Sequence, residues 1–511
     1  MFRLIFSLSF LIIGIKSAKI LGVFPTPSIS HQVVFRPFMQ ELAKLGHEVT
    51  VITTDPAFPK DQTPQNLTEI DIHDISYEHW NQFVSRMGNV KNRITFFKQF
   101  IEMITELVQK QLQSPTIQEF LRNNKKFDLL FVESCIRPGL IFSHIYNAPV
   151  IELSSMNGVF FVYEVFGAEV HPLIYPDVFH RRIYNMTMWE KINELYVHYS
   201  TRRIMAQNIH AEDEMLRKIF GPNTPSLEDI RRKVEMLLLT VDPIWDFNRP
   251  VPPNVVYLGS LHQKSQKDLP QDLKSYLDSS ENGVIYISFG TNVKPSMFSA
   301  DTLKIFNDVF SKLPYDVLWK WDNDELPGRS KNVRISKWLP QSDLLRHPKI
   351  KLFITQGGLQ STDEAIAAAV PLVGIPMFSD QWFNTEHYVK FNIGTRILIE
   401  ELTENALMNA IVTVIDDKSY RQNINKLREI LNDKPQKPLE SAVWWTEYVL
   451  RHGGQPLRTF GAGIGWTEYY ELNLVLPLLA ALVVVLIITV LAIYFIILNI
   501  RRYNSFKVKI N

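Results

Sequence analysis

The segments WLPQ (338–341), FITQGG (353–358) and GIPMFSDQ (374–381) decide the fold of this chain, together with Glu364. They place a glycine pair, an acidic residue and a final Asp-Gln pair at intervals that suit contacts to successive parts of one ligand. Short apolar runs surround them, and each has the length of a strand or of a helix body. This alternation predicts a parallel sheet with helices on both faces.

The glycine pair at 357–358 lies between a predicted strand and a predicted helix. The strand covers residues 352–355, and residues 365–370 are the apolar body of the helix. Bare backbone amides at the start of a helix, together with the helix dipole, favour a phosphate or diphosphate. A further strand at 371–375 brings residues 380–381 to the same rim, where open α/β sheets bind ligands.

The whole stretch closely resembles the signature of the UDP-glycosyltransferases, the family 1 enzymes with the glycosyltransferase B fold. The resemblance implies a role for each segment of the signature. Uracil stacks on Trp338 and bonds to Gln341, the diphosphate lies at Gln356, Gly357 and Gly358, the ribose bonds to Glu364, and the sugar bonds to Asp380 and Gln381. It also places the turn formed by Ser288, Gly290 and Thr291 near the diphosphate.

The fold class that we expect is α/β, with two doubly wound Rossmann-like domains facing a cleft and one C-terminal transmembrane helix. Prolines between 243 and 253 mark the boundary between the two domains. The predicted segments are a signal peptide at 1–18, an N-terminal acceptor domain at 19–245, a linker at 246–282, a UDP-sugar domain at 283–452, a stalk at 453–471, a transmembrane helix at 472–499 and a cytosolic tail at 500–511.

The two ends of the chain predict a type I membrane protein. The N-terminus has a basic residue, an apolar run and small residues before the predicted cut. The aliphatic run near the C-terminus is long enough to cross a membrane, and Arg501 and Arg502 follow it, which places the tail in the cytosol. Lys507 and Lys509 resemble a dilysine retrieval signal, and the family resemblance also points to the endoplasmic reticulum. The sequons at Asn66 and Asn185 predict lumenal glycosylation.

His31 is the predicted catalytic base. It follows the first strand, at 19–24, and a short loop, so it lies at the carboxyl rim of the N-terminal sheet. Histidine side chains ordinarily titrate near neutral pH, which suits proton abstraction. The Ser30-His31 pair also matches the position where the family has its general base.

A carboxylate usually orients such a histidine. The family has an Asp at the end of the corresponding strand, and this chain has Glu133 there. Asp128 is the rival, but it begins the strand at the wrong end of the sheet, and we interpret it as structural. A second departure is Gln356, where vertebrate members usually have His; Gln resembles invertebrate members and favours UDP-glucose as donor.

The composition excludes other classes of function. The net charge of +1 gives no reason to expect nucleic acid, one cysteine permits no internal disulfide, and no Cys/His motif has zinc spacing. The aromatic residues Phe160, Phe161, Tyr163 and Trp189 fit a core better than an acceptor pocket.

We therefore expect an inverting hexosyltransferase without a metal or other cofactor, acting on a small lipophilic acceptor in the lumen of the endoplasmic reticulum. A glucuronosyltransferase and a catalytically silent UDP-binding partner are the alternatives. The sequence leaves the acceptor and the oligomeric state open.

Overall fold

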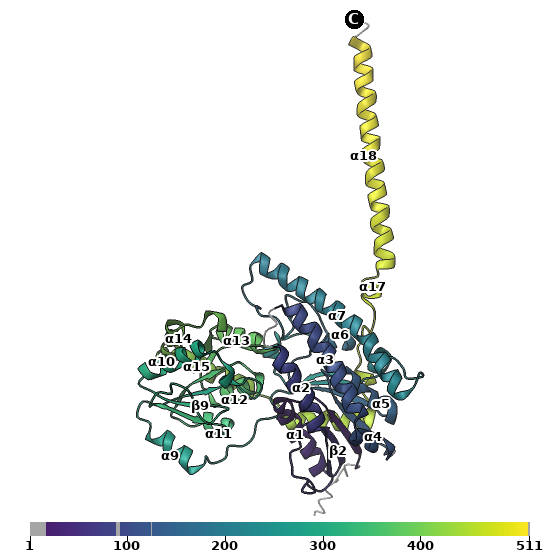
Figure 1. Ribbon diagram of the computed structural model, residues 1–511. Helices are drawn as coiled ribbons and strands as arrows, with labels where there is room; N and C mark the ends of the chain where they lie inside the picture. The colour runs from purple at the N-terminus through teal and green to yellow at the C-terminus, as the bar shows by residue number, and fades with distance from the viewer. Residues whose placement is uncertain (1–16, 88–91, 124, 509–511) are drawn as a thin grey trace, which may run out of the picture. The chain divides into compact units, whose positions relative to one another are not determined.

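The computed structural model describes residues 17–87, 92–123 and 125–508 (Figure 1). Contacts divide the chain into one unit that ends at Arg458 and a second that begins at Thr459. Residues 1–16 of the predicted signal peptide and residues 509–511 of the tail, with Lys509, lie outside the described part.

The first sheet has seven parallel strands in the order β3-β2-β1-β4-β5-β6-β7. These are β1 (Lys19–Phe24), β2 (Glu48–Thr53), β3 (Leu67–Asp71), β4 (Leu129–Glu133), β5 (Val150–Ser154), β6 (Met236–Leu239) and β7 (Val255–Tyr257). Its helices are α1 (Ile29–Lys44), α2 (His73–Met87), α3 (Arg93–Gln113), α4 (Pro115–Arg122), α5 (Ile141–Tyr146), α6 (Val162–Phe166), α7 (Met188–Phe220) and α8 (Leu227–Arg231).

The second sheet has six parallel strands in the order β10-β9-β8-β11-β12-β13. These are β8 (Val284–Ser288), β9 (Asp316–Lys320), β10 (Val333–Ser336), β11 (Ile350–Thr355), β12 (Leu372–Gly374) and β13 (Gly394–Arg396). Its helices are α9 (Gln271–Ser279), α10 (Ala300–Lys312), α11 (Gln341–Leu345), α12 (Leu359–Ala368), α13 (Gln381–Lys390), α14 (Glu404–Asp416) and α15 (Lys418–Asn432).

Central strands of both sheets are mostly apolar because helices cover both of their faces. In β4, Leu129 and Phe131 pack toward α1, while Leu130 and Val132 pack toward the helices of the opposite face. In the second sheet, Ile354 of β11 belongs to the cluster that contains α10 and α14. The prediction of two doubly wound α/β domains is therefore confirmed.

Two segments lie differently from the predicted division of the chain. The predicted linker at 246–282 contains β7, which pairs with β6 and completes the first sheet. The helix α16 (Pro438–His452), predicted within the second domain, packs against α1 of the first. Pro250, Pro252 and Pro253, just before Val255–Tyr257, hid β7, because prolines are typical of irregular chain. The exact domain limits stay a prediction.

The second unit contains α17 (Trp466–Tyr469) and α18 (Leu472–Val508). Within the described chain, α18 contains one candidate membrane span, Leu472–Asn504, with a mean hydropathy of 3.3. A helix of this length and composition is sufficient to cross a hydrocarbon core of about 30 Å. It includes the predicted transmembrane segment 472–499.

Candidate active site

His31 and Glu133 lie together at the carboxyl rim of the first sheet. His31 is in the first turn of α1, which follows β1, and Glu133 is the last residue of β4. Because β1 and β4 are neighbouring parallel strands, their carboxyl ends deliver both side chains to one place. The His31 Nδ1 and Glu133 Oε1 atoms are 2.6 Å apart. Asp128 lies at the opposite end, where its carboxylate accepts a hydrogen bond from the Lys19 backbone amide at 2.7 Å.

Backbone and side-chain hydrogen bonds fix this pair. The Glu133 side chain is fully buried, and its Oε2 accepts a bond from the Thr26 amide at 3.3 Å. The His31 side chain is 15% exposed, in contrast to Glu133. Ser155, directly after β5, places its hydroxyl 3.0 Å from His31 Nδ1. Sequence reasoning missed Ser155, although it follows a predicted strand at the same rim.

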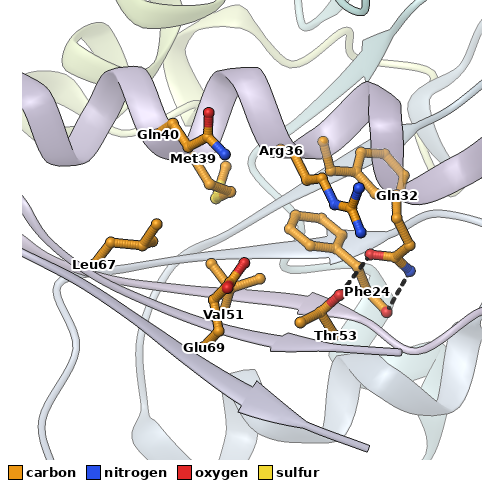
Figure 2. A pocket seen from close by; sticks show the side chains of 10 residues that line it. Phe24, Gln32, Arg36, Met39, Gln40, Val51, Thr53, Leu67 and Glu69 are labelled. Atoms are coloured by element: carbon orange, nitrogen blue, oxygen red, sulfur yellow. Dashed lines mark hydrogen bonds between the residues drawn. The ribbon is translucent and has the colours of Figure 1, made fainter. Parts of the chain in front are cut away.

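The residue after His31 anchors the start of α1. Gln32 is buried, and its amide donates to the carbonyls of Phe24 at 2.9 Å and Thr26 at 3.1 Å, while it accepts from the Thr53 hydroxyl at 2.9 Å. Figure 2 shows this side chain between α1 and the strand ends, beside a crevice of about 10 Å³. That space holds about one water molecule. The crevice is a packing feature, and Gln32 fixes the helix turn that presents His31.

Asp380 comes from the other domain and lies near enough to His31 for their charges to interact. The pKa of Asp380 is raised, mainly because burial removes water from its carboxylate. The nearby His31 partly opposes this shift. Its carboxylate accepts a bond from Asn384 at 2.7 Å. The side-chain oxygen of Gln381 accepts the amides of Met377 at 2.9 Å and Phe378 at 3.1 Å, so it orders the loop that presents Asp380.

Asn384 connects three parts of the site, and sequence reasoning missed it. Besides Asp380, its amide donates to the Gly357 carbonyl at 2.8 Å. Its oxygen accepts the indole N–H of Trp245 at 2.8 Å, which ties α13 to the N-terminal part of the chain. The position one helical turn after Asp380 was the available signal.

The turn at 357–358 has the geometry of an anion site. Gly357 has a φ of +92°, and a Cβ there would lie 2.6 Å from Thr385 Cγ2, so glycine is required. Gly358 is the N-cap of α12 and provides no side-chain cap; the Leu359 amide bonds to the Asp380 carboxylate, and the amides that follow in the first turn are oriented to bind an anion. The Gln356 amide nitrogen lies beside Gly290, where an added Cβ would be 2.3 Å away.

The remaining turn residues lie around this glycine. Ser288 is buried, and its hydroxyl accepts a bond from the Gly290 amide at 3.4 Å. Thr291 is exposed. Lys320, at the end of β9, donates to the Gly290 carbonyl at 2.8 Å and lies 4.9 Å from the centre of the Trp338 ring. Sequence reasoning missed this lysine, which brings a positive charge to the turn.

Trp338 and Glu364 are the positions predicted to bind the base and the ribose of the donor. The Trp338 side chain is 67% exposed, so it presents an apolar aromatic surface on which a base can stack. Gln341 donates to Glu364 at 2.7 Å and accepts from the Tyr286 hydroxyl at 2.9 Å. Burial raises the pKa of Glu364, and the bond from Gln341 lowers it.

The sequence matches the family described as "UDP-glucoronosyl and UDP-glucosyl transferase" over residues 18–505. The chain belongs to this family. It is a UDP-glycosyltransferase, as the signature predicted. This UDP-glycosyltransferase is 36% identical to the ecdysteroid UDP-glucosyltransferase of Lymantria dispar multicapsid nuclear polyhedrosis virus, over 91% of the chain and 94% of the viral protein. It is 31% identical to the UDP-glycosyltransferase UGT5 of Dactylopius coccus, over 94% of the chain and 91% of that protein.

Solved structures support the fold. The calicheamicin glycosyltransferase CalG4 superimposes with a TM-score of 0.58 at 15% identity, over 86% of this chain and 99% of CalG4. The enzyme Os79 of O. sativa, solved in complex with U2F and trichothecene, gives 0.58 at 16% identity, over 84% of this chain and all of Os79. The glycosyltransferase B fold is therefore confirmed for this UDP-glycosyltransferase.

The other predicted positions have mixed outcomes. Asn66 and Asn185 are both exposed, and their glycosylation stays a prediction. Phe160 and Tyr163 are buried, as expected of core residues, whereas Trp189 is 74% exposed on α7 and lies outside any core. Phe160 and Phe161 line a crevice of about 40 Å³, which is too small for a ring system unless side chains move.

Proposed function

We propose that this UDP-glycosyltransferase transfers glucose from UDP-glucose, with inversion, to a hydroxyl group of a small lipophilic acceptor. The observation that carries the proposal is the His31–Glu133 pair at 2.6 Å. His31 takes the hydroxyl proton, Glu133 stabilises the imidazolium, and the acceptor oxygen attacks the anomeric carbon.

The donor half positions UDP-glucose and stabilises the leaving group. Trp338 and Gln341 hold uracil, Glu364 holds the ribose, and Asp380 with Gln381 holds the sugar. As UDP leaves, the amides at the start of α12 and the Gln356 side chain bond to the diphosphate. Lys320 adds a cation beside Gly290. These groups can stabilise the charge of the leaving group without a metal cofactor.

Two observations favour glucose and an apolar acceptor. The relatives at 36% and 31% identity carry names of glucosyl or glycosyl transfer, and the first is named for ecdysteroids. Gln356 is neutral and brings no charge to attract a carboxylate sugar. We therefore place steroids and phenols first among acceptors, and conjugation of such compounds as the role.

The location of the enzyme is part of the proposal. The helix α18 anchors the chain, and the basic residues Arg501 and Arg502 keep the tail in the cytosol. The catalytic domains then lie in the lumen of the endoplasmic reticulum, where a signal peptide delivers them and Asn66 and Asn185 are accessible for glycosylation. This orientation is tested by treating the full-length protein with an endoglycosidase: we expect its molecular mass to fall as N-linked glycans are removed.

A donor comparison tests the function. With a panel of steroids and phenols, we expect turnover with UDP-glucose and at least about tenfold lower kcat/KM with UDP-glucuronate, which corresponds to a difference of about 1.4 kcal/mol. Product formation is measured by mass spectrometry and UDP release. The opposite donor preference would favour a glucuronosyltransferase, and folded protein that binds UDP but glycosylates no acceptor would favour a silent binding partner.

A further inference from the structure

The single cysteine of the chain lies beside the proposed catalytic pair. Cys135 follows Glu133 by two residues, in the loop after β4. One ligand atom each from His31, Glu133 and Cys135 lies within 4.8 Å of the others. The Cys135 sulfur is also 3.8 Å from the Thr26 hydroxyl, and the Thr26 amide donates to Glu133. Side chains from a helix, a strand end and a loop thus converge on one point.

These three groups are a suitable ligand set for zinc. Zn²⁺ binds imidazole nitrogen, carboxylate oxygen and thiolate sulfur at about 2.0–2.3 Å, and a tetrahedral site separates its ligand atoms by roughly 3.3–3.6 Å. His31 Nδ1 and Glu133 Oε1 are 2.6 Å apart, which is closer than in a zinc site. No two of the three ligand atoms are more than 4.8 Å apart, which is somewhat wider than in a zinc site. Side-chain shifts of about 1 Å therefore suffice to close the site. Three protein ligands leave the fourth position to water.

We propose that His31, Glu133 and Cys135 form an inhibitory zinc site. Zn²⁺ binds Cys135 as the thiolate, and the thiol proton passes to the solvent. Glu133 binds as the carboxylate, and His31 binds through Nδ1, so that the ring proton moves to Nε2. One proton is released overall. With Nε2 protonated and Nδ1 bound to zinc, His31 has no lone pair to accept the hydroxyl proton.

The surroundings of the site favour zinc over harder cations. Mg²⁺ and Ca²⁺ require several oxygen ligands, whereas this group offers one carboxylate beside nitrogen and sulfur. The buried Glu133 carboxylate is shielded from water, and the partly exposed His31 provides the way in. Inhibition by zinc rests on the proposed role of His31 as base; zinc binding does not.

Cobalt titration of the full-length protein in detergent tests binding without any substrate. Tetrahedral Co²⁺ with a thiolate ligand gives a sulfur-to-metal charge-transfer band, and since the chain has one cysteine, the band reports on Cys135 alone. We expect the band in the wild type, its loss in Cys135→Ser and Cys135→Ala, and its displacement by Zn²⁺. A titration of the wild type that gives no such band would overturn the site, whether or not either variant folds.

Inhibition by zinc is measured with the same proteins. We expect Zn²⁺ to inhibit the wild type, EDTA to reverse the inhibition, and Mg²⁺ to leave activity unchanged. Cys135→Ser should retain basal turnover within about twofold and require at least about tenfold more zinc for the same inhibition, because it lacks one ligand.

The control His73→Ala alters a histidine of α2 and should keep wild-type sensitivity to zinc. Equal inhibition of wild type and Cys135→Ser would contradict the proposal. If no acceptor is glycosylated, the proposed function fails, while the cobalt titration still decides the site.

Discussion

The His31→Ala variant is expected to lower turnover of UDP-glucose and acceptor by about 10³-fold, within the range that general-base catalysis contributes. In the proposed mechanism His31 takes the hydroxyl proton, while the other domain provides the contacts to uracil, ribose and diphosphate. The dissociation constant of UDP, measured by calorimetry, should therefore change by less than about threefold.

A matched control separates this effect from general damage to the domain. His73 lies in the same domain, at the start of α2, and its ring contacts the Thr54 carbonyl at 2.7 Å. His73→Ala should retain turnover within about twofold. If His31→Ala kept wild-type turnover, His31 would not be the base. A large loss of UDP affinity would show that the substitution also disturbs the donor half.

The Glu133→Gln variant is expected to reduce turnover by roughly 10²–10⁴-fold, comparable to the loss when a triad aspartate becomes an amide. Glutamine keeps the shape of Glu133 but lacks the negative charge that stabilises the imidazolium, and it can present a donor to Nδ1. Steady-state kinetics should show the loss in kcat, with little change in the affinity for UDP.

Two further variants sharpen the assignment. Asp128→Asn removes a carboxylate that accepts the Lys19 amide at the far end of the sheet, so we expect turnover near the wild-type value. Glu133→Asp restores the residue usual in the family but shortens the side chain that reaches His31, so an intermediate turnover is expected. If Asp128→Asn lost turnover and Glu133→Gln kept it, the roles assigned to the two carboxylates would be reversed.

The sequence predicted the strand, turn and helix between residues 350 and 368 well because these segments are local. Strand β11, the turn at 357–358 and helix α12 follow one another, so the spacing of their residues fixes their geometry. The link between His31 and Glu133 was predicted for a different reason. The family resemblance assigned the base to His31 and its carboxylate partner to Glu133 at the end of a predicted strand, and the carboxyl ends of neighbouring parallel strands meet at one rim.

Other parts of the site depend on contacts that spacing does not encode. The bond between Trp245 and Asn384 joins residues on different domains, and the Cys135 thiol reaches the catalytic pair because of the path of a loop. The strand β13 has three residues and begins with glycine, so its pattern is too short to identify. The packing of α16 against α1 also required the structure, since an amphipathic helix does not specify its partner.

The configuration of the product at its anomeric carbon tests the central claim most directly. UDP-glucose carries an α-linked sugar, and a single in-line attack by an oxygen that His31 deprotonates must invert that centre. Proton NMR of the purified glycoside distinguishes the two anomers by the coupling of the anomeric proton. We predict the β-glucoside; an α-glucoside would contradict single displacement and, with it, the role proposed for the His31–Glu133 pair.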